Sequence, residues 1–247
     1  MFSIFTNSFS FLISYLFIQS ISSFSILLFY VTRIHSLLLC FLLLKLSMFP
    51  FHFWYINIVY RFPLLPLFFV STFHKIPSFA LVSFFSIPVT NFFLLSIPIT
   101  ILVSSILIVS SSDFRILIVS SSVGNNSWFF LSILFSYDFF LLYIFSYSLN
   151  FYLLLSSLSP YSSLQYSHCF KHQNNNVFIF FLLALSGIPP FPLFFLKAFL
   201  VYSQSFILPP LCIFFSLVFT FLIVSSYVIS RFKLISYRYS LFVYSLN

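Results

Sequence analysis

The apolar residues of this chain fall into runs of roughly 20 residues, separated by short polar or proline-marked breaks. A run of that length spans the hydrocarbon core of a bilayer as an α-helix. The runs are apolar on every side, whereas barrel strands would alternate. The pattern therefore predicts about eight transmembrane helices. We place them at 7–30, 36–57, 62–84, 90–111, 114–136, 138–158, 177–202 and 206–230.

The composition agrees with an all-α polytopic membrane protein. Hydrophobic residues make up 62% of the chain and charged residues only 5%, too few to cover a soluble domain. The net charge of +8 comes from isolated residues and forms no basic patch. Cys40, Cys169 and Cys212 are too widely spaced to indicate a disulfide framework or a metal site. No phosphate-binding loop, paired carboxylates or nucleophile constellation is present in the sequence.

Lysine and arginine residues between the runs predict the orientation. One side receives a single basic residue, Arg33. The other side receives six, and by the positive-inside rule it also carries the N-terminus, the polar loop 159–176 and the C-terminus. The six are Arg61, Arg115, Lys171, Arg231, Lys233 and Arg238.

Lys45 lies inside an apolar run, with Pro50 five residues later and His52 just beyond. It is about 18–24 Å along a helix from the nearest loop arginines, too far to reach water fully. A lysine at this depth costs roughly 2.5–3.5 kcal/mol, and the proline breaks or kinks the helix. A charge beside a broken helix is typical of ion-coupled transport. The alternative is an interfacial lysine in a misplaced span.

Two more lysines fall inside spans. Lys75 lies mid-span next to His74, with Pro77 expected to loosen the helix. Lys197 follows Pro189 and Pro190, and the pairing of a lysine with a proline break repeats that of the first lysine in opposite chain order. Partial snorkelling is the alternative for both lysines. Hydrogen-bonded structural roles are the simpler interpretation of the two histidines, His52 and His74.

Other polar residues carry weaker signals. Asp113 and Arg115 are interpreted as a solvated pair at a helix start, and Asp138 suits a helix N-terminus. The serines 120–122 together with Asn125 and Asn126 are expected either to line a wet cavity or to bond between helices.

Five segments resemble a known family. Residues 45–54 (Lys-Leu-Ser-Met-Phe-Pro-Phe-His-Phe-Trp) resemble the Lys-Leu-Gly…Pro-Phe-His-Phe-Trp motif of subunit 2 of mitochondrial NADH dehydrogenase, the antiporter-like family of respiratory complex I. The other four keep the family order: 15–20 resembles Tyr-Phe-Leu-x-Gln-Ser, 73–76 Trp-Gln-Lys-Leu/Ile, 121–128 Ser-Ser-Ile-x-His-x-Gly-Trp, and 185–197 Leu-Gly-Gly-Leu-Pro-Pro…Lys.

The resemblance implies two inverted repeats, each with one broken helix. It divides the chain into the remainder of a first repeat (1–84), a second repeat (85–230) and a basic tail (231–247). It implies proton translocation coupled to NADH oxidation by ubiquinone, in the mitochondrial inner membrane with the positive side in the matrix. No cofactor is expected in this chain. The implied proton-carrying residues are Lys45, Lys75 and Lys197, supported by Pro50, His52, His74, Ser122, Asn125, Pro189 and Pro190.

The chain departs from the family pattern in one respect that matters for mechanism. The family pairs its first lysine with a glutamate on an earlier helix, but residues 1–112 contain no Asp or Glu. We therefore expect the first repeat to be incomplete and a separate chain to supply helices and a carboxylate near Lys45. Other membrane-arm subunits and lipids are the remaining expected partners, and no nucleic acid is expected. The alternatives are a structural remnant that no longer pumps and a subunit of a cation/proton antiporter.

Overall fold

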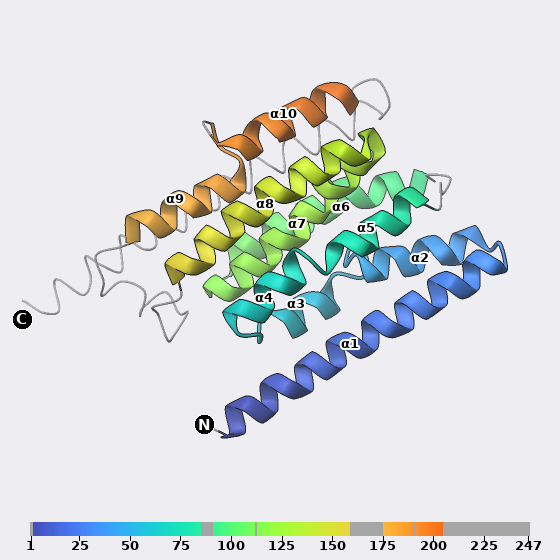
Figure 1. Cartoon of the computed structure of the whole chain (residues 1–247), viewed down its shortest axis with the longest axis horizontal. Coiled ribbons are helices and arrows are strands. Elements are labelled where there is room, and N and C mark those ends of the chain that lie inside the picture. The colour runs from blue at the N-terminus through green and yellow to red at the C-terminus, as the bar shows by residue number, and fades with distance from the viewer. Residues whose placement is uncertain (1, 85–90, 112, 159–174, 190, 205–247) are drawn as a thin grey trace, which may run out of the picture.

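The computed structural model describes residues 2–84, 91–111, 113–158, 175–189 and 191–204. This part of the chain folds into ten helices without a strand (Figure 1). Their bounds are α1 Phe2–Val31, α2 His35–Lys45, α3 Phe53–Val59, α4 Leu64–Ser71, α5 Lys75–Phe84, α6 Asn91–Ser110, α7 Phe114–Phe135, α8 Tyr137–Leu158, α9 Asn175–Ser186 and α10 Pro192–Gln204. The all-α architecture predicted from the hydrophobic runs is confirmed.

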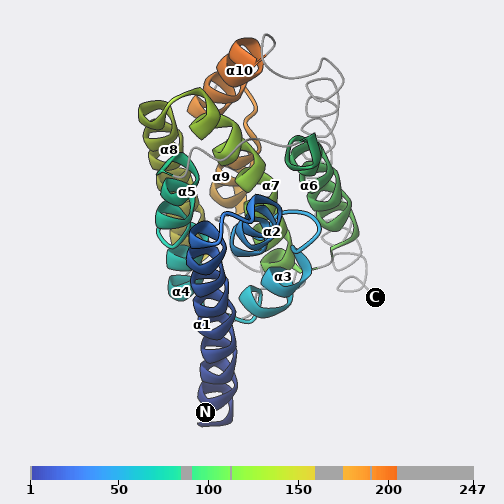
Figure 2. The same cartoon turned by 90° about the vertical axis from the view of Figure 1, so that its right-hand side faces the viewer.

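The helix α7 is the centre of the bundle. It packs against α3, α5, α6, α8 and α10, and Figure 2 shows it between α6 and α8. All residues from 117 to 132 are buried, including several serines and both asparagines. The long helix α1 lies along one edge, and α9 and α10 lie along the opposite edge (Figures 1 and 2). A polar stripe on α7 is therefore enclosed by protein on every side.

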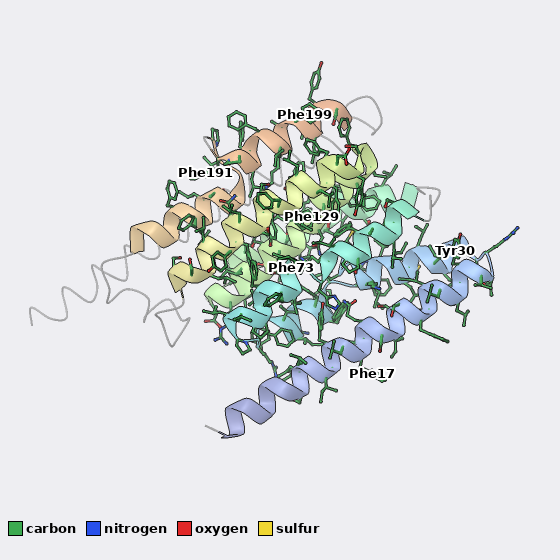
Figure 3. The ribbon with its side chains drawn as sticks, viewed as in Figure 1. Phe17, Tyr30, Phe73, Phe129, Phe191 and Phe199 are labelled. Carbon is green, nitrogen blue, oxygen red and sulfur yellow. The ribbon has the colours of Figure 1, made fainter. Side chains whose placement is uncertain are left out.

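Aromatic side chains fill the space around α7. The ring of Phe129 is fully buried and meets Phe79, Phe140, Tyr143 and Tyr147 at centroid distances of 5.1–6.3 Å. Such edge-on pairs add to the free energy gained from burial. Figure 3 shows Phe129 inside the bundle and Phe17 on the outer side of α1. The outward residues are apolar too, as a lipid-facing surface requires.

Both predicted helix breaks are confirmed. The apolar run at 36–57 divides into α2 and α3 around Pro50, and the run at 177–202 divides into α9 and α10 around Gly187 and Pro189. Proline cannot donate a backbone hydrogen bond and clashes with the carbonyl four residues earlier. Pro192 opens α10 at a position where its missing N–H costs nothing.

A third break, which the sequence analysis did not predict, interrupts the run at 62–84. The helix α4 ends at Ser71 and α5 begins at Lys75. Pro77, which was expected to loosen the helix of this run, lies in the first turn of α5. In a continuous helix its ring would clash with the carbonyl of Phe73, four residues earlier, so the interruption falls before the proline. Lys75 thus begins a helix instead of lying within one.

Four helical stretches of the described residues are long and apolar enough to cross a membrane: Ser10–Val31, Leu64–Ser83, Arg115–Phe135 and Tyr137–Ser157. Shorter apolar helices are Ser36–Lys45, Leu94–Ser110 and Pro192–Ser203. The predicted span 206–230, the tail 231–247, Pro190 and most of the loop 159–176 lie outside the described residues. The division of the chain into repeats stays a prediction.

Candidate functional site

The break between α2 and α3 leaves backbone carbonyl groups without helical partners. Side chains from α1, α3 and α7 bind them. The Trp54 indole N–H of α3 donates to the carbonyl of Leu44 (3.2 Å), and the Gln19 amide of α1 donates to the carbonyl of Lys45 (3.4 Å). The Asn126 amide of α7 donates to the carbonyl of Leu46 (2.7 Å). The break is therefore held by neutral donors.

Ser47 turns the chain at this break. Its φ is +53°, in the left-handed region that favours glycine. The resembled motif has glycine at this position. Here the serine hydroxyl donates to the carbonyl of Leu46 (2.6 Å) and accepts a bond from the Asn126 amide (3.1 Å). These bonds offset part of the conformational cost of a side chain at this φ.

Lys45 lies at the last turn of α2 and is half-buried. Among the described residues, no carboxylate lies near its ammonium group. His74 of the α4–α5 break is close enough to interact with it electrostatically. The Tyr15 ring of α1 covers His74 at a centroid distance of 5.4 Å and also meets Trp54 at 5.8 Å. Lys45 is thus an electrostatic neighbour of His74.

His52 is almost fully buried inside the first break. Its ring lies 4.0 Å from that of Phe53 and stacks with Phe49 at 6.2 Å. Neither ring nitrogen has a hydrogen-bond partner among the described residues. The structure therefore gives His52 apolar neighbours and does not place it in the hydrogen-bonded role that was its simpler interpretation. Pro50 lies two residues before it, in the turn that leads into α3.

Lys75 is buried, with 6% of its surface exposed. Its ammonium group donates to the backbone carbonyl of Ser122 on α7 (3.0 Å) and lies over the Tyr55 ring of α3 at 5.3 Å. The Tyr55 hydroxyl is 3.4 Å from the Ser122 hydroxyl. The Lys75 ammonium group is therefore stabilised by one carbonyl and one aromatic face. No carboxylate of the described residues contacts it.

Lys197 is buried in a similar way, with 8% of its surface exposed. Its ammonium group donates to the backbone carbonyl of Ser186, the last residue of α9, at 3.0 Å. It also lies over the Trp128 ring of α7 at 5.6 Å. Its cationic side chain thus caps the C-terminal end of a broken helix, where the helix dipole favours positive charge.

The two buried lysines meet the same helix. Lys75 reaches α7 at Ser122, and Lys197 reaches it at Trp128, about 9 Å further along the axis. Asn125 and Asn126 lie between these points, both buried, and their side-chain oxygens lack partners among the described residues. Asn125 donates to Ser121 within its own helix, whereas Asn126 bonds between helices. Polar groups thus follow α7 from one lysine to the other.

Sequence reasoning missed several members of this site. Tyr55 directly follows the quoted motif but was not singled out, although the Lys75 amine lies over its ring. Trp128 and Gln19 were noted only as parts of motifs. A tyrosine five residues after Pro50, in a run otherwise rich in phenylalanine, was the available signal for Tyr55. The contacts of Trp128 and Gln19 could be found only from the three-dimensional packing. Pro189 is exposed beside the second break.

Known proteins share this fold. A respiratory complex I structure from Thermus thermophilus superposes with a TM-score of 0.78 at 17% identity, over 90% of this chain and 58% of the other. The Mrp complex from Dietzia sp. gives 0.72 at 15% identity, over 91% and 50% respectively. The chain therefore shares its fold with a chain of each of these complexes. The predicted fold class is thereby confirmed.

The sequence itself is similar to a curated protein of the same kind. Over 160 residues it is 28% identical to NADH-ubiquinone oxidoreductase chain 2 of Anopheles gambiae, which covers 63% of this chain and 46% of that protein. The resemblance found in the motifs is thereby confirmed. No family model matches the chain. The chain spans about half the length of the proteins that it matches.

The hydrogen-bond donors of this site are amines, amides and hydroxyls. Within the described residues, no group of three His, Cys, Asp or Glu side chains comes together. The charged side chains instead are amines, which take up and release protons, placed against carbonyl oxygens and aromatic faces.

The contact between Lys197 and the second break leads to a prediction. Gly187 has φ +80°, and a Cβ added to it would lie 3.2 Å from Cδ and 3.3 Å from Nζ of Lys197. We expect Gly187→Ala to displace the amine from the carbonyl of Ser186 and to cost about 1–2 kcal/mol in backbone strain. Thermal unfolding of the purified assembly and its turnover measure the two effects. Ala198→Ser, at an exposed position of α10, is the control, and equal behaviour of both variants would contradict the prediction.

Proposed function

We propose that this chain is a membrane-arm subunit of respiratory complex I that takes part in proton translocation coupled to NADH oxidation by ubiquinone. It performs no redox chemistry and binds no cofactor. It is a multi-pass protein of the mitochondrial inner membrane, and its partners are other membrane-arm subunits and lipids. The likeness to chain 2 in sequence and to complex I in fold supports this assignment.

The observation that carries the proposal is that two buried lysine amines both contact α7. Lys75 and Lys197 are both buried and both bond to a backbone carbonyl at 3.0 Å. A buried charge is expensive in lipid and is retained where it has a function. Each carbonyl is uncharged, so it holds the protonated amine without fixing it as a carboxylate would. Loss of the proton exchanges a charge-assisted bond for a neutral one.

The polar groups between the amines provide the connection. Asn125 and Asn126 lie along α7 between the two contact points, Ser122 and Trp128, and Tyr55 links α3 to Ser122. On the other side, His74 of the α4–α5 break interacts electrostatically with Lys45. In this proposal protons pass along the axis from lysine to lysine, and the state of one amine alters the electrostatic free energy of the next.

Two other functions have support from single observations. The fold likeness to the Mrp complex favours a cation/proton antiporter subunit. The lack of a carboxylate near Lys45 among the described residues favours a structural remnant that does not pump. Purification of the native complex separates the first of these from our proposal, since flavin and iron–sulfur subunits accompany the chain only in complex I. The lysine substitutions described next separate the structural-remnant function from our proposal.

Replacing the lysines tests the pumping role. We expect Lys45→Met, Lys75→Met and Lys197→Met each to lower coupled proton pumping more than they lower the amount of assembled complex. Methionine preserves the apolar stem and removes the proton-carrying amine. Proton uptake by membrane vesicles, normalised to the assembled complex, measures the effect.

The matched control is Arg33→Asn, which removes an exposed charge outside the site and suits the φ of +57° at that residue. Pumping should stay near the wild-type value. If all three lysine variants pump as well as this control does, the structural-remnant function replaces our proposal.

The unpaired Lys45 leads to a second expectation. Residues 1–112 hold no acid, and Asp113 and Asp138 lie at helix starts. An unpaired ammonium group inside a membrane is strongly disfavoured. We propose that another polypeptide packs beside residues 7–57 and places an Asp or Glu within roughly 4 Å of Lys45. An atomic structure of the assembled complex decides, and the absence of any such carboxylate there would overturn this part of the proposal.

The charge distribution leads to an orientation. Because basic residues gather on one side, we propose that the N-terminus, the loop 159–176 and the C-terminus face the matrix. Protease digestion of mitoplasts tests this, with Lys171 and Arg238 expected to be protected until the inner membrane is opened. Cleavage at either residue in intact mitoplasts would contradict the assignment.

A further inference from the structure

Asn126 makes the shortest hydrogen bond between the central helix and the first break. Its side chain is fully buried, and its amide donates to the carbonyl of Leu46 at 2.7 Å and to the hydroxyl of Ser47 at 3.1 Å. These contacts join positions 80 and 79 residues apart in the sequence. The two residues that it binds directly follow Lys45. The backbone at this lysine is therefore attached to α7.

The attachment matters because the other lysines meet α7 themselves. Lys75 bonds to Ser122, one turn before Asn126, and Lys197 lies over Trp128, two residues after it. Lys45 has no such contact among the described residues, and α7 instead binds the two residues that follow it, Leu46 and Ser47. Leu46 and Ser47, which bind Asn126, directly follow Lys45 in the chain. Their position therefore fixes the position of the Lys45 backbone, from which its side chain extends.

The resembled motifs do not predict this pair of residues. Ser47 stands where that motif has glycine, and Asn126 stands at a position that its motif leaves open. The hydroxyl and the amide bind each other and the same carbonyl. A serine at φ +53° is thereby supported by a side chain from another helix.

We propose that Asn126 is a positioning residue that fixes the α2–α3 break on the central helix and thereby sets the place of Lys45 on the proton path. This inference rests on the proposed function. It adds a residue-specific link between the first lysine and the helix that the other two lysines contact. A buried carbonyl that loses its donor is costly, so without the amide the turn would shift toward other donors.

Two substitutions of Asn126 separate the effect of losing its hydrogen bonds from the effect of losing its side-chain volume. Asn126→Leu fills the space without a donor, and Asn126→Ala leaves it open. We expect both to lower coupled turnover per assembled complex roughly three- to tenfold, the effect of losing one buried hydrogen bond. The control is Asn150→Leu. Asn150 is a buried asparagine of α8 whose amide, within the described part of the chain, bonds to its own helix (Ser146 carbonyl, 3.0 Å).

A double-mutant cycle with Lys45→Met shows whether Asn126 acts through the lysine. We expect Asn126→Leu to add little to the loss caused by Lys45→Met, since the lysine that it positions is gone. Losses that multiply would show a separate structural role and overturn the inference. The same conclusion would follow if Asn126→Leu kept full turnover while Asn126→Ala lost it, because packing alone would then explain the loss.

The cycle also separates this inference from the proposed function. If Lys45→Met itself leaves turnover unchanged, the proposed role of the first lysine fails. If Lys45→Met lowers turnover and Asn126→Leu does not, only the inference fails. Should Asn126→Leu prevent assembly, Asn126→Ala in the same cycle provides the comparison, and a multiplied loss again overturns the inference.

Discussion

The constraint on which this structure depends is that a broken helix inside a membrane must find hydrogen-bond donors for its freed carbonyl groups within the protein. Water cannot supply them at that depth, so each break requires polar side chains at fixed positions. Those side chains must in turn come from neighbouring helices. The buried serines, amides and lysines around α7 are therefore part of the fold as well as of the site.

The breaks meet this constraint in different ways. At the first break, three neutral side chains bind the carbonyls of residues 44–46. The amine of the adjacent Lys45 binds none of these carbonyls in the described part of the chain. At the second break, the lysine is itself the donor and binds the carbonyl of Ser186. The amine of Lys75 binds the central helix instead. Proton loss thus affects backbone hydrogen bonding at Lys75 and Lys197, whereas at Lys45 the response depends on what lies beside it.

Much of the fold and part of the site could be predicted from the sequence. Runs of apolar residues located the helices, because span length is set by the bilayer. Prolines located two of the breaks. The third break was missed because Pro77 was assumed to act where it stands, although its clash is with Phe73, on the preceding turn. The lysines were found because a charge in an apolar run is conspicuous. Tyr55 and Gln19 were not, because an aromatic or amide side chain gains its role only from the neighbour that packing brings to it.

The central claim is that a continuous polar path along α7 joins Lys75 and Lys197. The most direct measurement is an atomic-resolution structure of the assembled complex in lipid, with its ordered water. The side-chain oxygens of Asn125 and Asn126 are buried and lack partners among the described residues, and such groups ordinarily bind water. The account predicts ordered waters at both oxygens, linking the Ser122 end of the path to the Trp128 end. Apolar side chains packed against both oxygens, with no water between the two lysines, would contradict it.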